Sequence, residues 1–514
     1  MDPSVENTKP GQYILTIDQG TTSSRVLMID HNLKVVDIEQ REHRQISLHP
    51  GWCEHDPEEI YANVKECLEV ISLRNNLSPP AIQALGITNQ RETVVAVDKT
   101  TGKALHNAIV WLDKRTSVIV KHFEEKLGGD LNAYREVCGL PVNTYFSGVK
   151  MKWLIDHCGE VKKAHEEGNL FFGTIDTWLV YKLTGGKTIL TDSSNASRTM
   201  LMDLKTLNWS DFMLGEFGIK KEALPQIKLS SSDDYGIVSS VECLNGVPIT
   251  GVIGDQQGAC LGHLLKEGEV KNTYGTGCFI LSNVGKTPVQ STHGLLTTLC
   301  YSLGEGHTYY ALEGAVEIAG AAVQWAKSVG LLTSASELEP LATSVSDCGD
   351  VYFVPAFNGI FSPYWRDDAR GLIIGISLNT TRGHIARALL EAPCLRTKEV
   401  VEAMAKDSGH VIRKMNVDGG MTVNNFMLQQ QADFTNIAIV RKRETEVTGI
   451  GAAIAAGLKV GFWSGVSEVE EKIKVDRVFE SVISAGERDK KYKRWAQAVQ
   501  RSIGFGWSEQ EYDE

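Results

Sequence analysis

The sequence predicts an α/β protein with two large domains. Its 514 residues are too many for one hydrophobic core, because chains beyond about 300 residues usually divide into domains. Short apolar runs typical of strands alternate with segments of helical periodicity through the first half. Two glycine-threonine turns, each between two strand-like runs, lie about half a chain apart. This repetition suggests that the chain consists of two related halves.

The composition narrows the classes of function. Hydrophobic residues make up 42% and charged residues 23% of the chain, as is usual for soluble proteins. The net charge of −12 argues against a nucleic-acid surface, although a locally positive site can still bind an anionic substrate. The most apolar window, residues 449–463, is short and rich in glycine and alanine. It predicts a tightly packed helix and not a membrane span.

The cysteines and the chain ends indicate in which cellular compartment the protein is expected. Ten cysteines are scattered without a CxxC pair, which favours free thiols in a reducing environment over a disulfide framework or a zinc site. The polar, acidic start is not typical of a secretory signal, and the last residues are not a peroxisomal address. We therefore expect a cytoplasmic protein with no membrane span and no nucleic-acid partner.

The first turn has the chemistry of a phosphate-binding hairpin. Residues 14–29 form two apolar runs around the turn Gly20-Thr-Thr-Ser-Ser-Arg25. Backbone N–H groups, hydroxyls and Arg25 suit a phosphate. Asp18 ends the first strand and would repel a phosphate unless a cation lay between them, so it suggests Mg²⁺. An ordinary Thr/Ser-rich turn is the alternative. Residues 271–282 repeat the pattern in the second half.

The remaining elements follow from local patterns. Asp56 and Pro57 mark the start of a helix, and residues 60–71 carry its apolar face. Further elements are expected in this order: sheet over 33–47, a buried strand over 84–88, helical structure over 203–225, a small-residue helix over 311–325, a long helix over 381–404, and a strand, Gly-Gly turn and helix over 416–425.

Polar residues follow several of the predicted strands. The carboxyl ends of strands are where α/β proteins bind ligands. Arg91 and Glu92 could donate to and accept from neighbouring hydroxyls of a polyol, or form a surface ion pair. Trp111 could be a pocket wall or part of the core. Asp255 could accept a proton from a substrate hydroxyl, or could cap a helix.

Five motifs in order carry a resemblance to a known family. They are Asp18–Arg25, Asn89–Glu92, Tyr145–Gly148, Gly254–Gln257 and Tyr274–Phe279. Together they resemble the glycerol kinase branch of the FGGY sugar and polyol kinases, from about residue 13 to residue 463. The resemblance implies two ribonuclease-H-like (actin-like ATPase) domains, residues 1–262 and 263–514, with a catalytic cleft between them.

The resemblance also implies roles for individual residues. Asp255 would be the general base, and Asp18 would help to hold Mg²⁺. The glycerol site would consist of Arg91, Glu92, Trp111, Tyr145, Asp255, Gln256 and Phe279. The ATP site would consist of Thr21, Thr22, Ser23 and Arg25 from the first domain, and Thr276, Gly320, Gln324, Gly420 and Asn424 from the second.

The activity implied is the ATP-dependent phosphorylation of glycerol to sn-glycerol 3-phosphate, in a homodimer or homotetramer. Two alternatives stay open: a kinase for another small polyol or ketose, and an actin- or chaperone-like nucleotide-binding protein that hydrolyses ATP slowly. Some relatives are controlled through a histidine in the loop that matches Ser230–Gly236, or by fructose 1,6-bisphosphate through a Gly-Gly-Thr-Arg stretch. This chain has neither feature, so we expect neither control.

Overall fold

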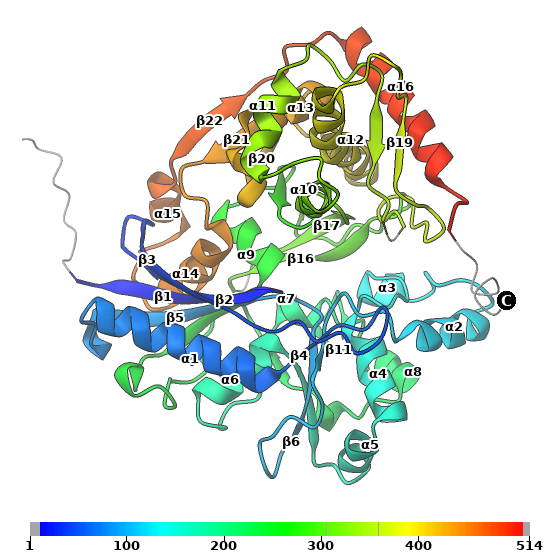
Figure 1. The fold of residues 1–514 in the computed structure, drawn as a ribbon. Coiled ribbons are helices and arrows are strands. Elements are labelled where there is room, and N and C mark those ends of the chain that lie inside the picture. The colour runs from blue at the N-terminus through cyan, green and yellow to red at the C-terminus, as the bar shows by residue number, and fades with distance from the viewer. Residues whose placement is uncertain (1–10, 305, 358, 507–514) are drawn as a thin grey trace, which may run out of the picture.

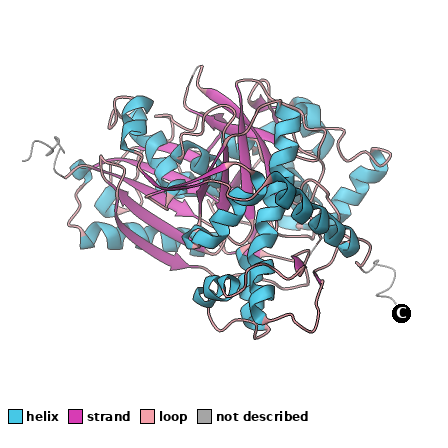
Figure 2. Ribbon diagram, turned by 90° about the horizontal axis from the view of Figure 1, so that it is seen from above, coloured by secondary structure: helices cyan, strands magenta, loops and turns pink. Residues whose placement is uncertain are grey.

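The computed structural model describes residues 11–304, 306–357 and 359–506. Two mixed β-sheets, each flanked by helices, make up most of the molecule (Figures 1 and 2). We call residues 11–262 the first lobe and residues 263–506 the second lobe. No helix in the described ranges is long and apolar enough to cross a membrane.

The first lobe is built around a five-stranded sheet. Its outer three strands form an antiparallel meander, and the next two run parallel to β1. In spatial order the strands are β13 (Ile249–Gly254), β5 (Ile82–Asn89), β1 (Tyr13–Gln19), β2 (Ser23–Ile29) and β3 (Val35–Glu42). The predicted first hairpin is therefore β1–β2, in which Asp18 pairs with Arg25.

The second lobe repeats this arrangement in a seven-stranded sheet. Strands β14, β15 and β17 form the meander, and β20 and β21 run parallel to β14. In spatial order the strands are β16 (Leu296–Ser302), β17 (Thr308–Val316), β15 (Cys278–Gly285), β14 (Val270–Tyr274), β20 (Lys414–Asp418), β21 (Ala438–Lys442) and β22 (Val475–Phe479). The duplicated order confirms the expected fold class.

Shorter strands complete both lobes. A four-stranded sheet in the first lobe consists of β4 (Glu54–His55), β7 (Ala108–Ile109), β6 (Val94–Asp98) and β8 (Leu170–Thr174). The two-stranded pairs are β9 (Leu190–Asp192) with β12 (Gln226–Lys228), β10 (Met202–Asp203) with β11 (Asn208–Trp209), and β18 (Tyr352–Val354) with β19 (Leu372–Ile374).

The helices cover both faces of each main sheet. Those of the first lobe are α1 (Pro57–Arg74), α2 (Ser117–Lys126), α3 (Arg135–Cys138), α4 (Ser147–His157), α5 (Gly159–Glu166), α6 (Ile175–Leu183), α7 (Ser193–Ala196), α8 (Asp211–Phe217) and α9 (Asp255–Gly262). Those of the second are α10 (Gly320–Ser328), α11 (Leu338–Thr343), α12 (Arg382–Ser408), α13 (Asn425–Thr435), α14 (Val447–Lys459), α15 (Val466–Lys472) and α16 (Ala485–Ser502). As predicted, Asp56 caps α1, its carboxylate accepting from the N–H groups of Glu58 and Glu59.

Helix α14 crosses from the second lobe to the first. Helices α1 and α6 cover one face of the first sheet, and α14 packs with α9 on the other (Figure 1). Glycines bring these backbones together: a Cβ on Gly451 would lie 1.8 Å from the carbonyl oxygen of Gly258, and one on Gly86 would lie 2.6 Å from that of Ala452. The apolar window at 449–463 is thus the packed helix that its composition predicts.

Two sequence-based expectations need correction. The helical structure expected over residues 203–225 is confined to α8 and to the 3-10 turn Lys221–Ala223. The segment begins instead with a turn between two short strands, because the carboxylate of Asp203 accepts from the N–H groups of Lys205 and Thr206 and forms a turn that competes with a helix. Residues 311–316 belong to strand β17, and the helix α10 begins only at Gly320. A short buried apolar run has no periodicity that separates strand from helix, which explains this second error.

Candidate functional site

Three predicted site residues lie at or just after the carboxyl ends of neighbouring strands. In the parallel register of the first sheet, Asn89 at the end of β5 pairs with Gln19 on one side and with Gly254 on the other. Asp18, Arg91 and Asp255 are therefore brought to one edge of the sheet by three strands that are far apart in sequence. This is the edge at which α/β sheets bind ligands.

An aromatic wall joins the two lobes at this edge. The ring centroid of Trp111 lies 5.5 Å from that of Tyr145 and 5.9 Å from that of Phe279, which is on β15 of the second lobe. The indole N–H of Trp111 donates to the hydroxyl of Thr21 at 2.9 Å. Tyr145 and Phe279, two further predicted residues of the glycerol site, thus both lie against Trp111, which also reaches the first phosphate hairpin.

Arg91 is held by carboxylates of both lobes. Its Nη1 and Nη2 donate to the two oxygens of Glu313 on β17, at 2.7 and 2.8 Å, in a two-pronged ion pair. Its Nε lies 3.1 Å from Oδ1 of Asp255. Because Arg91 and Glu313 are both buried, this pair is shielded from water. Sequence reasoning paired Arg91 with its neighbour Glu92, whose carboxylate is 4.0 Å from Nε.

Glu92 has a different arginine partner. The Nε of Arg198, which follows α7, donates to Oε1 of Glu92 at 2.6 Å, and its Nη2 donates to Glu313 at 3.2 Å. Glu92 itself has a positive φ of 62°, a backbone conformation that is costly for a side chain other than glycine. Neither Glu313 nor Arg198 was predicted, because nothing in the local pattern around them indicates a ligand.

Asp255 retains one free oxygen. It is the first residue of α9 and not the helix cap, and its side chain is 29% exposed. Oδ1 accepts from the N–H of Gln256 at 2.7 Å and faces Arg91, whereas no hydrogen bond to Oδ2 is found within the described ranges. Burial raises the pKa of this carboxyl, and the nearby positive charge of Arg91 opposes that shift. The free Oδ2 can therefore accept a proton.

Gln256 is oriented by a lysine of the second lobe. The ammonium of Lys271 on β14 donates to Oε1 of Gln256 and, at 2.9 Å, to the hydroxyl of Thr273. Because an ammonium only donates, it fixes the amide oxygen toward itself and leaves the NH₂ group of Gln256 to donate elsewhere. Lys271 is a further residue that sequence reasoning did not single out.

Asp18 has the character of a cation ligand. Its side chain is 9% exposed, and it makes no side-chain hydrogen bond in the part of the chain that the structure describes. Burial raises its pKa to about 6; the positive charge of Arg25 works against this, while Glu446 and Asp255 add to it. A hard cation would stabilise the ionised form. The described residues contain no group of three or more His, Cys, Asp or Glu side chains that could hold a metal. One carboxylate together with phosphate oxygens is a donor set that suits Mg²⁺.

The other hairpin residues lie nearby in different environments. The carbonyl of Thr21 accepts from the side chains of His43 and Gln45, at 2.9 and 3.0 Å. Thr22 is exposed and Ser23 is buried. Arg25 forms an ion pair with Glu446 at 2.7 Å, next to the start of α14, so its charge is already partly balanced by the second lobe.

Three glycine-containing segments meet in the second lobe. The N–H of Gly320 donates to the carbonyl of Gly275 at 3.0 Å, and a Cβ on Gly320 would lie 2.6 Å from that oxygen. Gly419 has a φ of +91°, and its Cβ would lie 2.4 Å from the carbonyl oxygen of Tyr274. The second hairpin, the start of α10 and the Gly-Gly turn therefore form one continuous backbone surface.

The remaining predicted nucleotide residues lie on these same segments. The carbonyl of Thr276 accepts from the N–H groups of Ala319 and Ala321. The amide oxygen of Asn424 caps α13 by accepting from Met427 at 2.8 Å. Gln324 on α10 and Gly420 are exposed. Next to this turn, His263 at the end of α9 is 2.8 Å from the carboxylate of Asp418.

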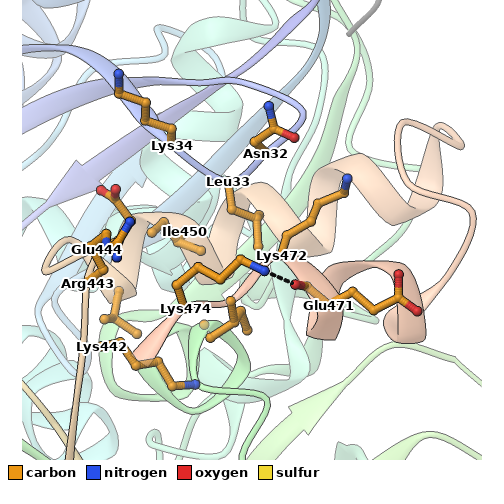
Figure 3. A pocket seen from close by; sticks show the side chains of 13 residues that line it. Asn32, Leu33, Lys34, Lys442, Arg443, Glu444, Ile450, Glu471, Lys472 and Lys474 are labelled. Carbon is orange, nitrogen blue, oxygen red and sulfur yellow. Dashed lines mark hydrogen bonds between the residues drawn. The ribbon is translucent and has the colours of Figure 1, made fainter. Parts of the chain in front are cut away.

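A separate cavity of about 700 Å³ lies beside the start of α14 (Figure 3). It is lined from the β2–β3 turn by Asn32, Leu33 and Lys34, and from the second lobe by side chains that include Lys442, Arg443, Lys472 and Lys474. None of the predicted catalytic, glycerol-binding or ATP-binding residues lines it.

Known proteins match this chain over nearly its whole length. The glycerol kinase of Arabidopsis thaliana is 47% identical and that of Acidiphilium cryptum also 47%; each match covers 96% of this chain and 98% or 99% of the relative. Among solved structures, Plasmodium falciparum glycerol kinase with ADP superposes with a TM-score of 0.89 at 41% identity, covering 96% of this chain and 98% of that one. A gluconate kinase from Lactobacillus acidophilus, 22% identical over 95% and 97% of the two chains, shares the fold with a TM-score of 0.84.

The family patterns agree with these relatives. Residues 13–262 match the N-terminal domain, and residues 270–460 the C-terminal domain, of the FGGY carbohydrate kinases. Because both domains are present in order and together cover most of the chain, the chain belongs to the FGGY family of carbohydrate kinases.

Proposed function

We propose that this chain transfers the γ-phosphoryl group of ATP to glycerol and forms sn-glycerol 3-phosphate, with Asp255 as the general base. The observation that carries the proposal is the free Oδ2 of Asp255 at the meeting point of the lobes, beside groups suited to a small polyol. The full-length glycerol kinase relatives support glycerol as the acceptor.

The acceptor would be bound by side chains that have one polar atom occupied by a protein partner and another available for a hydrogen bond. Glu92 has one oxygen occupied by Arg198 and can accept from a glycerol hydroxyl with the other. Gln256 can donate through the NH₂ group that Lys271 leaves free. The rings of Trp111, Tyr145 and Phe279 would cover the carbon backbone, which favours a three-carbon polyol over a longer sugar.

Asp255 would act on the terminal hydroxyl. Its Oδ2 would accept the hydroxyl proton as the oxygen attacks the γ-phosphorus, and the bond from that phosphorus to the leaving oxygen of ADP would break. Arg91, at 3.1 Å from Oδ1, favours the ionised form that this step needs.

The phosphates would be bound between the two hairpins. We assign the terminal phosphates of ATP to the first hairpin, through Thr21, Thr22, Ser23 and Arg25. We assign the rest of the nucleotide to the glycine-containing backbone surface of the second lobe, through Thr276, Gly320, Gln324, Gly420 and Asn424. Asp18 would hold Mg²⁺, which supplies charge neutralisation on the phosphate oxygens when it is bound. Contact between the lobes at Trp111 and Phe279 would exclude water, which could otherwise accept the phosphoryl group.

The decisive experiment measures ADP production by the purified chain with MgATP, alone and with glycerol, xylulose or gluconate. Glycerol should stimulate turnover by about 100-fold or more, and the other two acceptors far less. Equal or better turnover with xylulose would favour a different sugar kinase. Slow ATP hydrolysis that no acceptor stimulates would favour an actin- or chaperone-like protein. We further propose a homodimer or homotetramer in the cytoplasm, and size-exclusion chromatography with light scattering would test the oligomeric state.

A further inference from the structure

Glu313 is a charged residue in the interior of the second lobe. It lies in β17, between strands β16 and β15, and its side chain is fully buried. Both of its ionic partners, Arg91 and Arg198, come from the first lobe. A carboxylate in such a place loses its hydration, and only close, well-oriented cations can offset that loss. The side chain is therefore not an incidental surface charge.

The two-pronged pair determines which part of Arg91 faces the base. Nη1 and Nη2 of Arg91 are both engaged by Glu313, so only its Nε side is presented to Asp255. An unengaged guanidinium would offer Asp255 two parallel N–H groups, and such a fork matches both oxygens of a carboxylate. That pairing would occupy Oδ2, the oxygen that the proposed reaction needs.

We propose that Glu313 is a positioning residue that acts through Arg91, holding the guanidinium fork away from Asp255 so that Oδ2 stays free for the acceptor hydroxyl. This inference rests on the proposed function, because it explains how the base of that reaction is kept available. Since Glu313 belongs to the second lobe, the base is fully available only when the two lobes are in contact.

A double-mutant cycle tests this indirect action. Glu313→Gln keeps the size of the side chain but removes its charge, and we expect it to lower kcat by about 100-fold while the KM for ATP changes by less than about threefold. In an Arg91→Gln background the same substitution should lower kcat by less than about threefold further, because the group through which it acts is gone. Multiplicative losses in the double variant would overturn the proposal.

Two further variants separate positioning from folding. Glu399→Gln is the matched control: this buried glutamate also pairs with an arginine, Arg396, and accepts from the indole of Trp495, but all these partners lie in the second lobe. It should lower the melting temperature and leave kcat unchanged. Glu313→Asp keeps the charge, and its kcat should be at least tenfold higher than that of Glu313→Gln. If Glu313→Gln does not fold, Glu313→Asp takes its place in the cycle with Arg91→Gln, and multiplicative losses there would likewise overturn the proposal.

The outcome also separates this inference from the proposed function. Glycerol-stimulated ADP production by the unmodified chain tests the reaction itself. If that activity is present and Glu313→Gln turns over normally, the positioning role is wrong and the proposed function stands. If glycerol does not stimulate the unmodified chain, the proposed function fails first.

Discussion

At the scale of single residues, the site is a set of charges whose partners decide what each can do. Arg91 and Glu92 are adjacent in sequence, yet they point to different partners, Glu313 and Arg198. Two arginines and three carboxylates, counting Asp255, form one chain of contacts across the lobes. The positive φ of Glu92 is consistent with this divergence, because it turns the backbone between the two side chains.

The role of Asp255 can be tested by removing its basicity alone. Asp255→Asn keeps the shape of the side chain and can still bond a hydroxyl, so we expect the Kd for glycerol to change by less than about threefold. The value of kcat should fall by about 1,000-fold, or ~4 kcal/mol in barrier height, because no group accepts the hydroxyl proton. Rapid-quench kinetics and isothermal titration would measure the two quantities. Turnover within tenfold of the unmodified chain would exclude Asp255 as the base.

The pH dependence of turnover should report on the same carboxyl. Burial raises the pKa of Asp255, so the protonated, inactive form persists to higher pH than for an ordinary aspartate. We therefore expect kcat/KM for glycerol to increase with pH and to reach half its plateau above pH 3.8, the ordinary value. A midpoint at or below that value, in protein shown by circular dichroism to be folded, would contradict the assignment.

At the scale of elements, glycines decide how closely α14 approaches the first sheet and α9. The backbone oxygen of Gly258 occupies the place where a Cβ of residue 451 would be, so no side chain can be accommodated there without moving a helix. A glycine inside a helix normally costs stability, and here close packing between backbones offsets that cost. The pattern of glycines at 86, 251, 258 and 451 is thus explained by contact between elements and not by turns.

A pair of glycine substitutions tests this packing. We expect Gly451→Ala to lower the free energy of unfolding by about 3 kcal/mol, because the added methyl overlaps with Gly258. Gly486→Ala is the control, since that position in α16 has no atom within 4 Å of the added Cβ, and it should change stability by less than about 1 kcal/mol. Urea denaturation at 25 °C would measure both. Equal effects of the two changes would show that the contact between α9 and α14 is not limiting.

At the scale of the whole molecule, the predicted domain boundary in the sequence does not coincide with a boundary between hydrophobic cores. Helix α14 belongs to the second half of the chain, but its residues Ile450, Ala453 and Ile454 are buried against Ile14 and Leu27 of the first sheet. The boundary between residues 262 and 263 remains a prediction. The packing of α14 shows that the core of the first lobe includes a helix from beyond that boundary.

A fragment of residues 1–262 tests whether the first lobe needs α14 to fold. Without α14 it would expose the apolar face formed by Ile14, Leu27, Ala84 and Ile253, and such a patch promotes association. We expect the fragment to bind a hydrophobic dye and to lack a cooperative thermal transition, whereas the full chain should show one. A monomeric fragment that unfolds cooperatively would show that the first half folds without α14.

The sequence by itself determined the fold class and the family. Spaced motifs in a fixed order and two hairpins of the same kind are local features that can be recognised from the order of the residues alone. It also singled out Asp18, Arg91 and Asp255, since each lies near the carboxyl end of a predicted strand. Their roles, like those of the other predicted site residues, are proposals that the experiments above address.

Only the tertiary structure decided which charges meet. Arg198 and Lys271 lie in segments whose patterns indicate only loop and strand, and Glu313 lies in a run that the sequence predicts as helix. They become part of the site because the second lobe faces the first. The same is true of α14, whose composition predicts tight packing but not the sheet on which it packs. Local patterns encode which backbone a segment adopts, whereas the partner of a buried charge or helix depends on contacts between residues hundreds of positions apart.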